Sequence, residues 1–468
     1  MIRAELDTLD WILGLFVARQ RRRKRSCPNL GINECQGSAG AQAGFHGGPM
    51  TISWRDATGA ARTDWPVVEQ IVSPPRDALI WPKELQQNRF LRRQGTPGGN
   101  DDTVGDFDSL KQFRTDDPDA QAFLIRAYQY VIARFDVDGF RIDTLRYLKG
   151  DLPRLFGNAV REFALQAGKK NFFTYGEVLC NDSEDVIANF IGRHTNDGND
   201  LVGVDAALDY PLFGVLKWVV KGLNPPTNVI GMYQNRKNQE ENVLSSHGDA
   251  TRFFVTFLDN HDMKERIRFV QPGDEHKFDD QVTLGLASLL ALPGVPCVYY
   301  GTEQGLSGHG TDEAVREALW GGPGFNSGTV FYQAVQRILK VRASRPALRY
   351  GRFYFRPVSG DGQTFGASGL PGGVLAFSRI LNDEEVLVVA NTNTEQGQSL
   401  DVIVEIRLSQ RGSTYQLLYS NKATPRAPSP VRETGPVTVM DVDGSIGHGP
   451  LHVVHVNLQP MEVQILGR

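Results

Sequence analysis

At 468 residues the chain has room for roughly two or three domains and for a large buried core. Hydrophobic residues make up 40% of it and charged residues 22%, and 50 basic against 54 acidic side chains leave a net charge of −4. This is the composition of a soluble globular protein, and it argues against wholesale disorder and against nucleic-acid binding through bulk positive charge.

Cysteine content and the first residues give expectations about cellular location. The four cysteines show no CxxC spacing, which predicts free thiols in a reducing compartment and hence a cytoplasmic protein. The longest apolar run near the N-terminus, Trp11 to Ala18, is far shorter than the ~18 residues of a membrane span. It follows acidic residues, whereas a secretory signal begins with basic ones. We therefore expect no membrane partner and no export signal.

Residues 1–50 form an anomalous N-terminal segment, without helical or strand periodicity. Within it, Arg19–Arg25 holds six basic residues in seven. Such a run is either a nucleic-acid or localisation patch or, more commonly, a solvated surface, and we expect no nucleic-acid partner. Residues 51–110, rich in Gly, Pro and Trp, predict an irregular insert.

From about residue 118 to 344, strand-like and helix-like segments alternate. Asp117 and Pro118 supply an N-cap and a proline at the first helical position. The expected helices cover 118–135, 152–167, 281–291 and 331–344, and the expected strands cover 138–143, 171–177, 204–210, 253–258 and 295–300. This alternation predicts an α/β domain over 111–345, with a parallel sheet and helical crossovers.

Residues 346–468 have a different sequence pattern: short β-rich runs follow one another, with Gly, Asn, Asp and Pro between them. The expected strands are 374–380, 386–391, 402–406, 415–419, 452–458 and 462–466. No helical pattern intervenes, so this region predicts an antiparallel β-sandwich.

Three acidic residues stand at the C-terminal ends of expected strands: Asp143, Glu177 and Asp262. In a closed parallel barrel these ends converge on one mouth, where such folds place their chemistry. Arg141 lies two residues before Asp143, so both side chains point to the same side of the strand, and the guanidinium favours an ionised carboxylate. A nucleophile must be ionised.

Glu177 ends a strand rich in apolar groups, and burial favours the protonated form that a general acid needs. Asp262 can place negative charge opposite an oxocarbenium ion, while His261 and Asn260 can contact sugar hydroxyls. Each residue also has a simpler interpretation: a strand-end acid is commonly a cap or a solvated residue, and Arg141 with Asp143 can be a structural ion pair.

Four segments together resemble the α-amylase superfamily, the glycoside hydrolase family 13 enzymes: Gly139-Phe-Arg-Ile-Asp143, Gly176-Glu177, Phe257-Leu-Asp-Asn-His-Asp262 and Gly294-Val-Pro-Cys-Val-Tyr-Tyr-Gly-Thr-Glu303. They occur in the family's order. The resemblance implies an α/β fold, a (β/α)8 TIM-type barrel followed by a C-terminal antiparallel β-sandwich, with residues 51–110 resembling the insert called domain B.

By this resemblance Asp143 is the nucleophile, Glu177 the general acid/base and Asp262 the transition-state stabiliser of a retaining reaction on α-glucans or maltooligosaccharides. Arg141, His261 and Asn260 then contact the substrate. Retention predicts that the carboxyl groups of Asp143 and Glu177 lie ~5 to 5.5 Å apart. Arg146 and Tyr147 stand where many amylases have lysine and histidine that meet the leaving-group sugar, and helix-surface packing is an equally good interpretation of both.

The family's early Asp-x-x-x-Asn-His segment is not found, and no pattern in residues 1–50 corresponds to the first three strand–helix units of the barrel. We therefore expect a barrel incomplete at its N-terminus, through truncation or a shifted reading frame. Calcium is possible by resemblance, but no cofactor or metal ligand is identified.

Two alternatives to the hydrolase interpretation stay open. One is a glucosyl transferase or isomerase of the same superfamily, which shares the motifs around the acids. The other is an inactive carbohydrate-binding protein or nonfunctional fragment. The oligomeric state does not follow from the sequence.

Overall fold

The computed structural model describes residues 17–18, 54–55, 61–62, 84, 88–90, 111–148, 151–179, 184–194, 203–239, 243–244, 254–268, 276–320, 324–422 and 426–468. They belong to two compact units. The first holds the described residues up to 179 together with 185–194, 203–208 and 243–244, and the second holds the remainder. The predictions for the basic run and for most of 1–50 and 51–110 fall outside the described residues. Cys297 forms no disulfide bond within the described part of the chain, and the other three cysteines lie outside that part.

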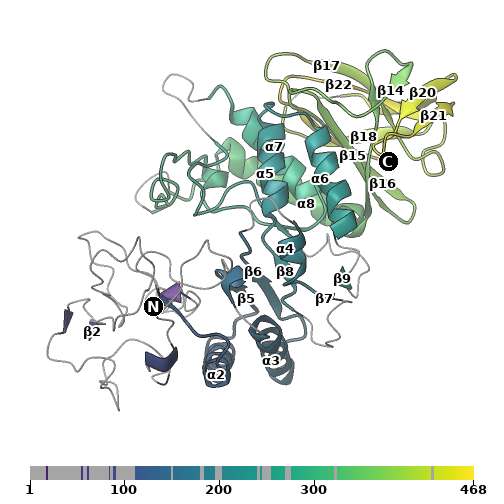
Figure 1. Cartoon of the computed structure of the whole chain (residues 1–468). Coiled ribbons are helices and arrows are strands. Elements are labelled where there is room, and N and C mark those ends of the chain that lie inside the picture. The colour runs from purple at the N-terminus through teal and green to yellow at the C-terminus, as the bar shows by residue number, and fades with distance from the viewer. Residues whose placement is uncertain are drawn as a thin grey trace. The chain divides into compact units, whose positions relative to one another are not determined.

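The first unit contains a three-stranded parallel sheet in the order β5 (Gly139–Ile142), β6 (Phe173–Gly176) and β8 (Ala206–Ala207). Helix α2 (Pro118–Phe135) precedes β5, and α3 (Leu152–Gln166) connects β5 to β6. Figure 1 shows α2 and α3 beside these strands. The other elements are α4 (Glu184–Ala188), η3 (Asn88–Phe90), and the strand pairs β1 (Val17–Ala18) with β4 (Lys111–Gln112), β2 (Trp54–Arg55) with β3 (Ala61–Arg62), and β7 (Arg193–His194) with β9 (Val243–Leu244).

An aromatic cluster fixes α2 and α3 against this sheet. Asp117 caps α2, because its side chain accepts hydrogen bonds from the two backbone amides at 119 and 120. The ring of Tyr128 then meets those of Phe140 and Phe156 edge-on, each with centroids 5.2 Å apart. Phe140 also meets Phe172 at 5.1 Å. Large rings in edge-to-face contact stabilise this strand–helix packing and so fix the position at which β5 ends.

The second unit carries the later strand–helix repeats. Helices α5 (Tyr210–Val220) and α6 (Thr227–Gln239) come before β10 (Val255–Thr256), which pairs in parallel with β11 (Val295–Pro296). Helix α7 (Asp279–Ala291) joins β10 to β11. A short 3-10 helix, η8 (Thr302–Gln304), is followed by α8 (Val330–Ser344) and α9 (Pro346–Tyr350).

An antiparallel sheet region completes the second unit. Nine strands follow the order β12-β15-β16-β23-β18-β19-β22-β17-β13, and β14, β20 and β21 form a smaller sheet. Their bounds are β12 (Arg352–Phe355), β13 (Val358–Ser359), β14 (Thr364–Phe365), β15 (Val374–Leu381), β16 (Glu384–Asn391), β17 (Gln398–Ile403), β18 (Thr414–Ser420), β19 (Ser429–Glu433), β20 (Val437–Met440), β21 (Ile446–Gly449), β22 (His452–Leu458) and β23 (Val463–Gly467).

Strands β15 and β16 are buried on both faces, and their two faces enter different cores. Leu375 and Phe377 pack in a cluster with residues of α5, α7 and α8, whereas Val374 and Ala376 face a cluster formed by the strands of the sandwich. Side chains alternate along a strand, and because both faces of β15 are covered, its first six residues are all buried, including Ser378 and Arg379. The sheet therefore packs on the helices of its own unit and on itself.

Several predicted strands are shorter or displaced in the structure. The strand predicted at 402–406 lies at Gln398–Ile403, because a turn over Glu405–Ser409 ends it early. The strand predicted at 204–210 keeps only Ala206–Ala207, since Asp209 caps α5 with a proline in its first turn. The strand predicted at 295–300 pairs only at Val295–Pro296.

Candidate active site

Asp143 and Glu177 are brought to one guanidinium in the first unit. Arg141 Nη1 lies 2.9 Å from Asp143 Oδ1, and Arg141 Nη2 lies 3.4 Å from Glu177 Oε2. The register of the sheet explains this, because Arg141 is paired with Tyr175 and Ile142 with Gly176, so the two strands end side by side. The predicted contact between Arg141 and Asp143 is thus found, and Glu177 shares it.

Glu177 is the more enclosed of the two acids. Its side chain is 11% exposed, compared with 37% for Asp143. The backbone amide of Thr144 lies 3.4 Å from Glu177 Oε2, at a residue with φ of 51°, which is unusual for a β-branched side chain. Backbone strain of this kind is often found at functional sites. The turn after β5 therefore directs an N–H group toward the carboxylate that ends β6.

A glycine permits this close approach. A Cβ atom at Gly176 would lie 2.1 Å from Leu145 Cδ2 and 2.8 Å from its Cβ. Leu145 is fully buried in the short helix η4 (Leu145–Tyr147), which follows Asp143. The Gly-Glu pair of the sequence motif is thus explained locally: the glycine admits the turn that carries the aspartate, and the next residue supplies the second carboxylate.

The charge of Arg141 is reinforced by its neighbours. Burial lowers the pKa of its guanidinium, but the carboxylates of Asp143 and Glu177 outweigh that effect and raise the pKa above its usual value. A permanently charged, planar donor group suits simultaneous contact with two carboxylates. It contributes a fixed positive charge between them, with the shorter contact on Asp143.

Asp262 and His261 lie in the second unit, where Arg316 holds them. Arg316 Nη2 lies 2.7 Å from Asp262 Oδ1, and its Nε donates to the His261 carbonyl oxygen at 2.8 Å. The other oxygen of Asp262 lies 3.0 Å from His261 Nε2. Sequence reasoning missed Arg316, which lies 54 residues beyond Asp262 in no motif that we identified. Only the fold brings the two together.

Asn260 shapes the turn that carries these residues. Its Oδ1 accepts hydrogen bonds from the backbone amides of Asp262, at 2.9 Å, and Met263, at 3.1 Å. Its Nδ2 is buried without a hydrogen-bond partner among the described residues. The geometry therefore gives the oxygen a structural role, and the predicted contact of Asn260 with the substrate stays a prediction.

Arg146 is tied to the loop after β6. Its Nη1 donates to the carbonyl oxygen of Leu179 at 2.6 Å. Tyr147 ends η4 and is half-buried. These contacts fit the packing interpretation of both residues, and their predicted role at the leaving-group sugar stays a prediction.

Metal-ligating clusters and membrane-spanning helices were sought in the described part of the chain. No three His, Cys, Asp or Glu side chains there gather closely enough to hold a metal ion. The described residues thus do not fit a carboxylate-built calcium centre, and we derive no step through one. No helix among the described residues is both long and apolar enough to cross a membrane.

Comparison with known proteins identifies the family. The model of the family "Alpha amylase, catalytic domain" matches residues 103–345. An α-amylase of Streptomyces lividans is 24% identical over 368 residues, which cover 71% of this chain and 36% of that protein. A cyclomaltodextrin glucanotransferase of Geobacillus stearothermophilus is 29% identical over 264 residues, covering 56% and 31%. The chain spans about a third of the length of these curated relatives.

Solved structures show the same fold. The α-amylase of Geobacillus thermoleovorans, complexed with acarbose, matches with a TM-score of 0.58 at 19% identity, over 81% of this chain and 71% of that one. The cyclomaltodextrin glucanotransferase CldA matches with a TM-score of 0.60 at 19% identity, over 81% and 66%. These findings confirm the predicted fold class, an α/β (β/α)8 TIM-type barrel followed by a C-terminal antiparallel β region. The chain belongs to the α-amylase family.

Proposed function

We propose that this chain is a retaining glycoside hydrolase that cleaves α-glucans or maltooligosaccharides through a covalent glycosyl-enzyme. The observation that carries the proposal is the shared guanidinium: Arg141 contacts Asp143 and Glu177, which end adjacent parallel strands. Two carboxyl groups near one scissile bond are the minimal machinery of glycoside hydrolysis. Membership of the α-amylase family supports the same reaction class.

The two acids take different parts in the proposed reaction. Glu177, the more enclosed of the two, donates a proton to the glycosidic oxygen as that bond breaks. Asp143, which has the shorter contact with Arg141, attacks the anomeric carbon through its carboxylate. Glu177, now ionised, then takes a proton from water, and the hydroxyl formed in this way displaces Asp143.

The remaining proposed residues act on the sugar. Asp262 stabilises the positive charge of the oxocarbenium-like transition state, and Arg316 and His261 hold its carboxylate in place. Asn260, which shapes the turn that carries Asp262, is proposed to contact a sugar hydroxyl. Arg146 and Tyr147 are proposed to meet the sugar that leaves.

Transfer of the glycosyl group to another sugar is the second candidate. One of the matched relatives is a cyclomaltodextrin glucanotransferase, at 29% identity. Hydrolysis and transfer share the covalent intermediate and differ in the acceptor, so the contacts around the acids favour neither. Product analysis with maltooligosaccharides separates them, because transfer yields chains longer than the substrate.

The proposal is tested by removing the nucleophile. Asp143→Asn is expected to lower kcat/KM for maltooligosaccharides by ~10³-fold or more, since an amide does not form the glycosyl ester. Asp138→Asn is the matched control, because Asp138 is highly exposed and pairs only with Lys169 among the ion pairs described. Near-normal turnover by Asp143→Asn would contradict the mechanism. No turnover by the unmodified chain would favour the inactive carbohydrate-binding alternative.

A further inference from the structure

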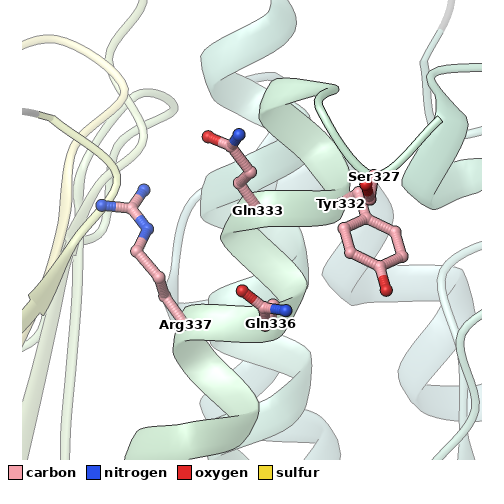
Figure 2. Close-up of a pocket in the computed structure, with 5 residues that line it drawn as sticks. All are labelled: Ser327, Tyr332, Gln333, Gln336 and Arg337. Carbon is pink, nitrogen blue, oxygen red and sulfur yellow. The ribbon is translucent and has the colours of Figure 1, made fainter.

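One face of α8 lines a polar pocket that the proposed reaction does not use. The pocket has a volume of about 540 Å³ and is lined by Ser327, Tyr332, Gln333, Gln336 and Arg337. Figure 2 shows these side chains around the first turns of α8 and the loop before it. The volume falls in the range of ~300–1,000 Å³ that is common for small-molecule sites. We call this feature the α8 pocket.

The helix presents this face rigidly. Its polar pocket residues recur at positions 332, 333, 336 and 337, which the 3.6-residue period places on one side. The opposite side is buried in the core of the second unit through Phe331, Ala334 and Ile338. Thr329 fixes the start of α8, since its hydroxyl caps the amide of Tyr332 at 3.0 Å and donates to the Glu303 carbonyl at 2.7 Å. A ligand would therefore meet a preformed surface.

The hydrogen-bonding groups of the pocket are not engaged by the protein. Within the described part of the chain, the side-chain amides of Gln333 and Gln336 and the hydroxyls of Ser327 and Tyr332 make no hydrogen bond to other side chains or backbone. Arg337 stacks over the ring of Tyr419, with its guanidinium 5.3 Å from the ring centroid, and forms no ion pair there. Five polar side chains thus line one volume, and the hydroxyls and side-chain amides among them have their donors and acceptors available.

The chemistry of this set favours a neutral polyhydroxyl ligand. Each glutamine offers a carbonyl acceptor beside its amide donors, and each hydroxyl both donates and accepts. Sugar hydroxyls have the same dual character, whereas a phosphate or carboxylate uses donors alone. Tyr332 adds a ring suited to the apolar face of a sugar. Among the described residues, no carboxylate lines the pocket.

We propose that the α8 pocket is a second carbohydrate site, which binds a segment of an α-glucan chain. Its lining residues include none of the three acids at the strand ends. The identity of the sugar as an α-glucan rests on the proposed function. A polymer held at two places on one protein gains effective concentration at each, so such a site increases retention on long glucans.

The test is binding to soluble starch by the full chain carrying Asp143→Asn, so that the polymer is not cleaved during the measurement. Mobility in native gels containing starch gives a dissociation constant. Adding Gln333→Ala and Gln336→Ala is expected to weaken retardation at least fivefold, because each substitution removes one hydrogen-bonding side chain. Alanine is a good helix former, so α8 is expected to persist, and circular dichroism and the unfolding midpoint check this.

The matched control is Gln166→Ala in the same background, since Gln166 is an exposed glutamine at the end of α3. It is expected to leave retardation unchanged. Unchanged retardation in the double pocket variant, or equal loss in the control, would overturn the proposal. Displacement of starch by inorganic phosphate but not by maltoheptaose would also overturn it, in favour of an anion site. The proposed function is judged separately, by cleavage of maltooligosaccharides by the unmodified chain.

Discussion

Replacing Arg141 with methionine should disturb both proposed acids at once. The guanidinium makes one ion pair at 2.9 Å and one at 3.4 Å, and its own side chain is 28% exposed. Hydrogen bonds to charged groups contribute ~1.5–3 kcal/mol each, and the exposure of Asp143, above one third, reduces the total. We therefore expect a loss of about 2–3 kcal/mol of transition-state stabilisation, which is roughly 30- to 150-fold in kcat/KM.

Rescue by the conservative variant distinguishes this effect from a general structural defect. Arg141→Lys keeps a positive charge beside the two carboxylates and should recover part of the lost kcat/KM. Arg161→Met is the control, because Arg161 forms an ion pair with Asp205 in the same unit. A kcat/KM of Arg141→Met equal to that of the unmodified chain or of Arg161→Met would refute the reasoning.

Two further predictions concern stability in the second unit. Arg236 and Asp209 form a bidentate ion pair whose side chains are 1% and 0% exposed, with Nη1 2.9 Å from Oδ2. Arg236→Met leaves the buried carboxylate of Asp209 without this partner, so we expect the free energy of unfolding in urea titrations to fall by ~3–5 kcal/mol. A loss below about 1 kcal/mol would contradict this. Burial raises the pKa of Glu385, but Arg356 and the hydrogen bonds from Ser378, Tyr415 and the amide of Glu405 outweigh it and lower the pKa overall. The ionised Glu385 side chain therefore contributes its full stabilisation above the unfolded pKa of ~4.3 and loses it as the pH falls through the lower folded pKa. We expect Glu385→Gln to flatten the acid side of the curve of stability against pH. An unchanged slope of the thermal unfolding midpoint between about pH 2 and 5 would argue against this.

The helices that the sequence predicted share strong periodicity or clear caps. Helix α2 begins and ends where the Asp-Pro signal and the apolar spacing place it, and α3, α7 and α8 begin and end within two residues of their predicted bounds. Helix α5 was missed because apolar residues run through nearly its whole length and hide the period. Helix α6 was missed for the opposite reason, since polar residues dominate it.

Some contacts of the candidate site could be predicted from the sequence, and others could not. The contact of Arg141 with Asp143 follows from side-chain alternation along one strand, and the approach of Glu177 follows from the parallel register with the next. Both contacts involve residues in one strand or in neighbouring strands, so they can be predicted from local sequence patterns. The pairing of Arg316 with Asp262 depends on a loop that returns from 54 residues away, and no local pattern indicates it. The α8 pocket likewise depends on which side of a helix the core covers.

The most direct test of the mechanism is identification of the residue that bonds to the sugar. A fluorinated glucosyl or maltosyl fluoride slows breakdown of a glycosyl-enzyme, so that the adduct can be located by mass spectrometry of peptides. We expect one added glycosyl group, on the peptide that contains Asp143 and on that residue. An active enzyme that accumulates no adduct, or carries it on Glu177 or another residue, would contradict the assignment of Asp143 as nucleophile.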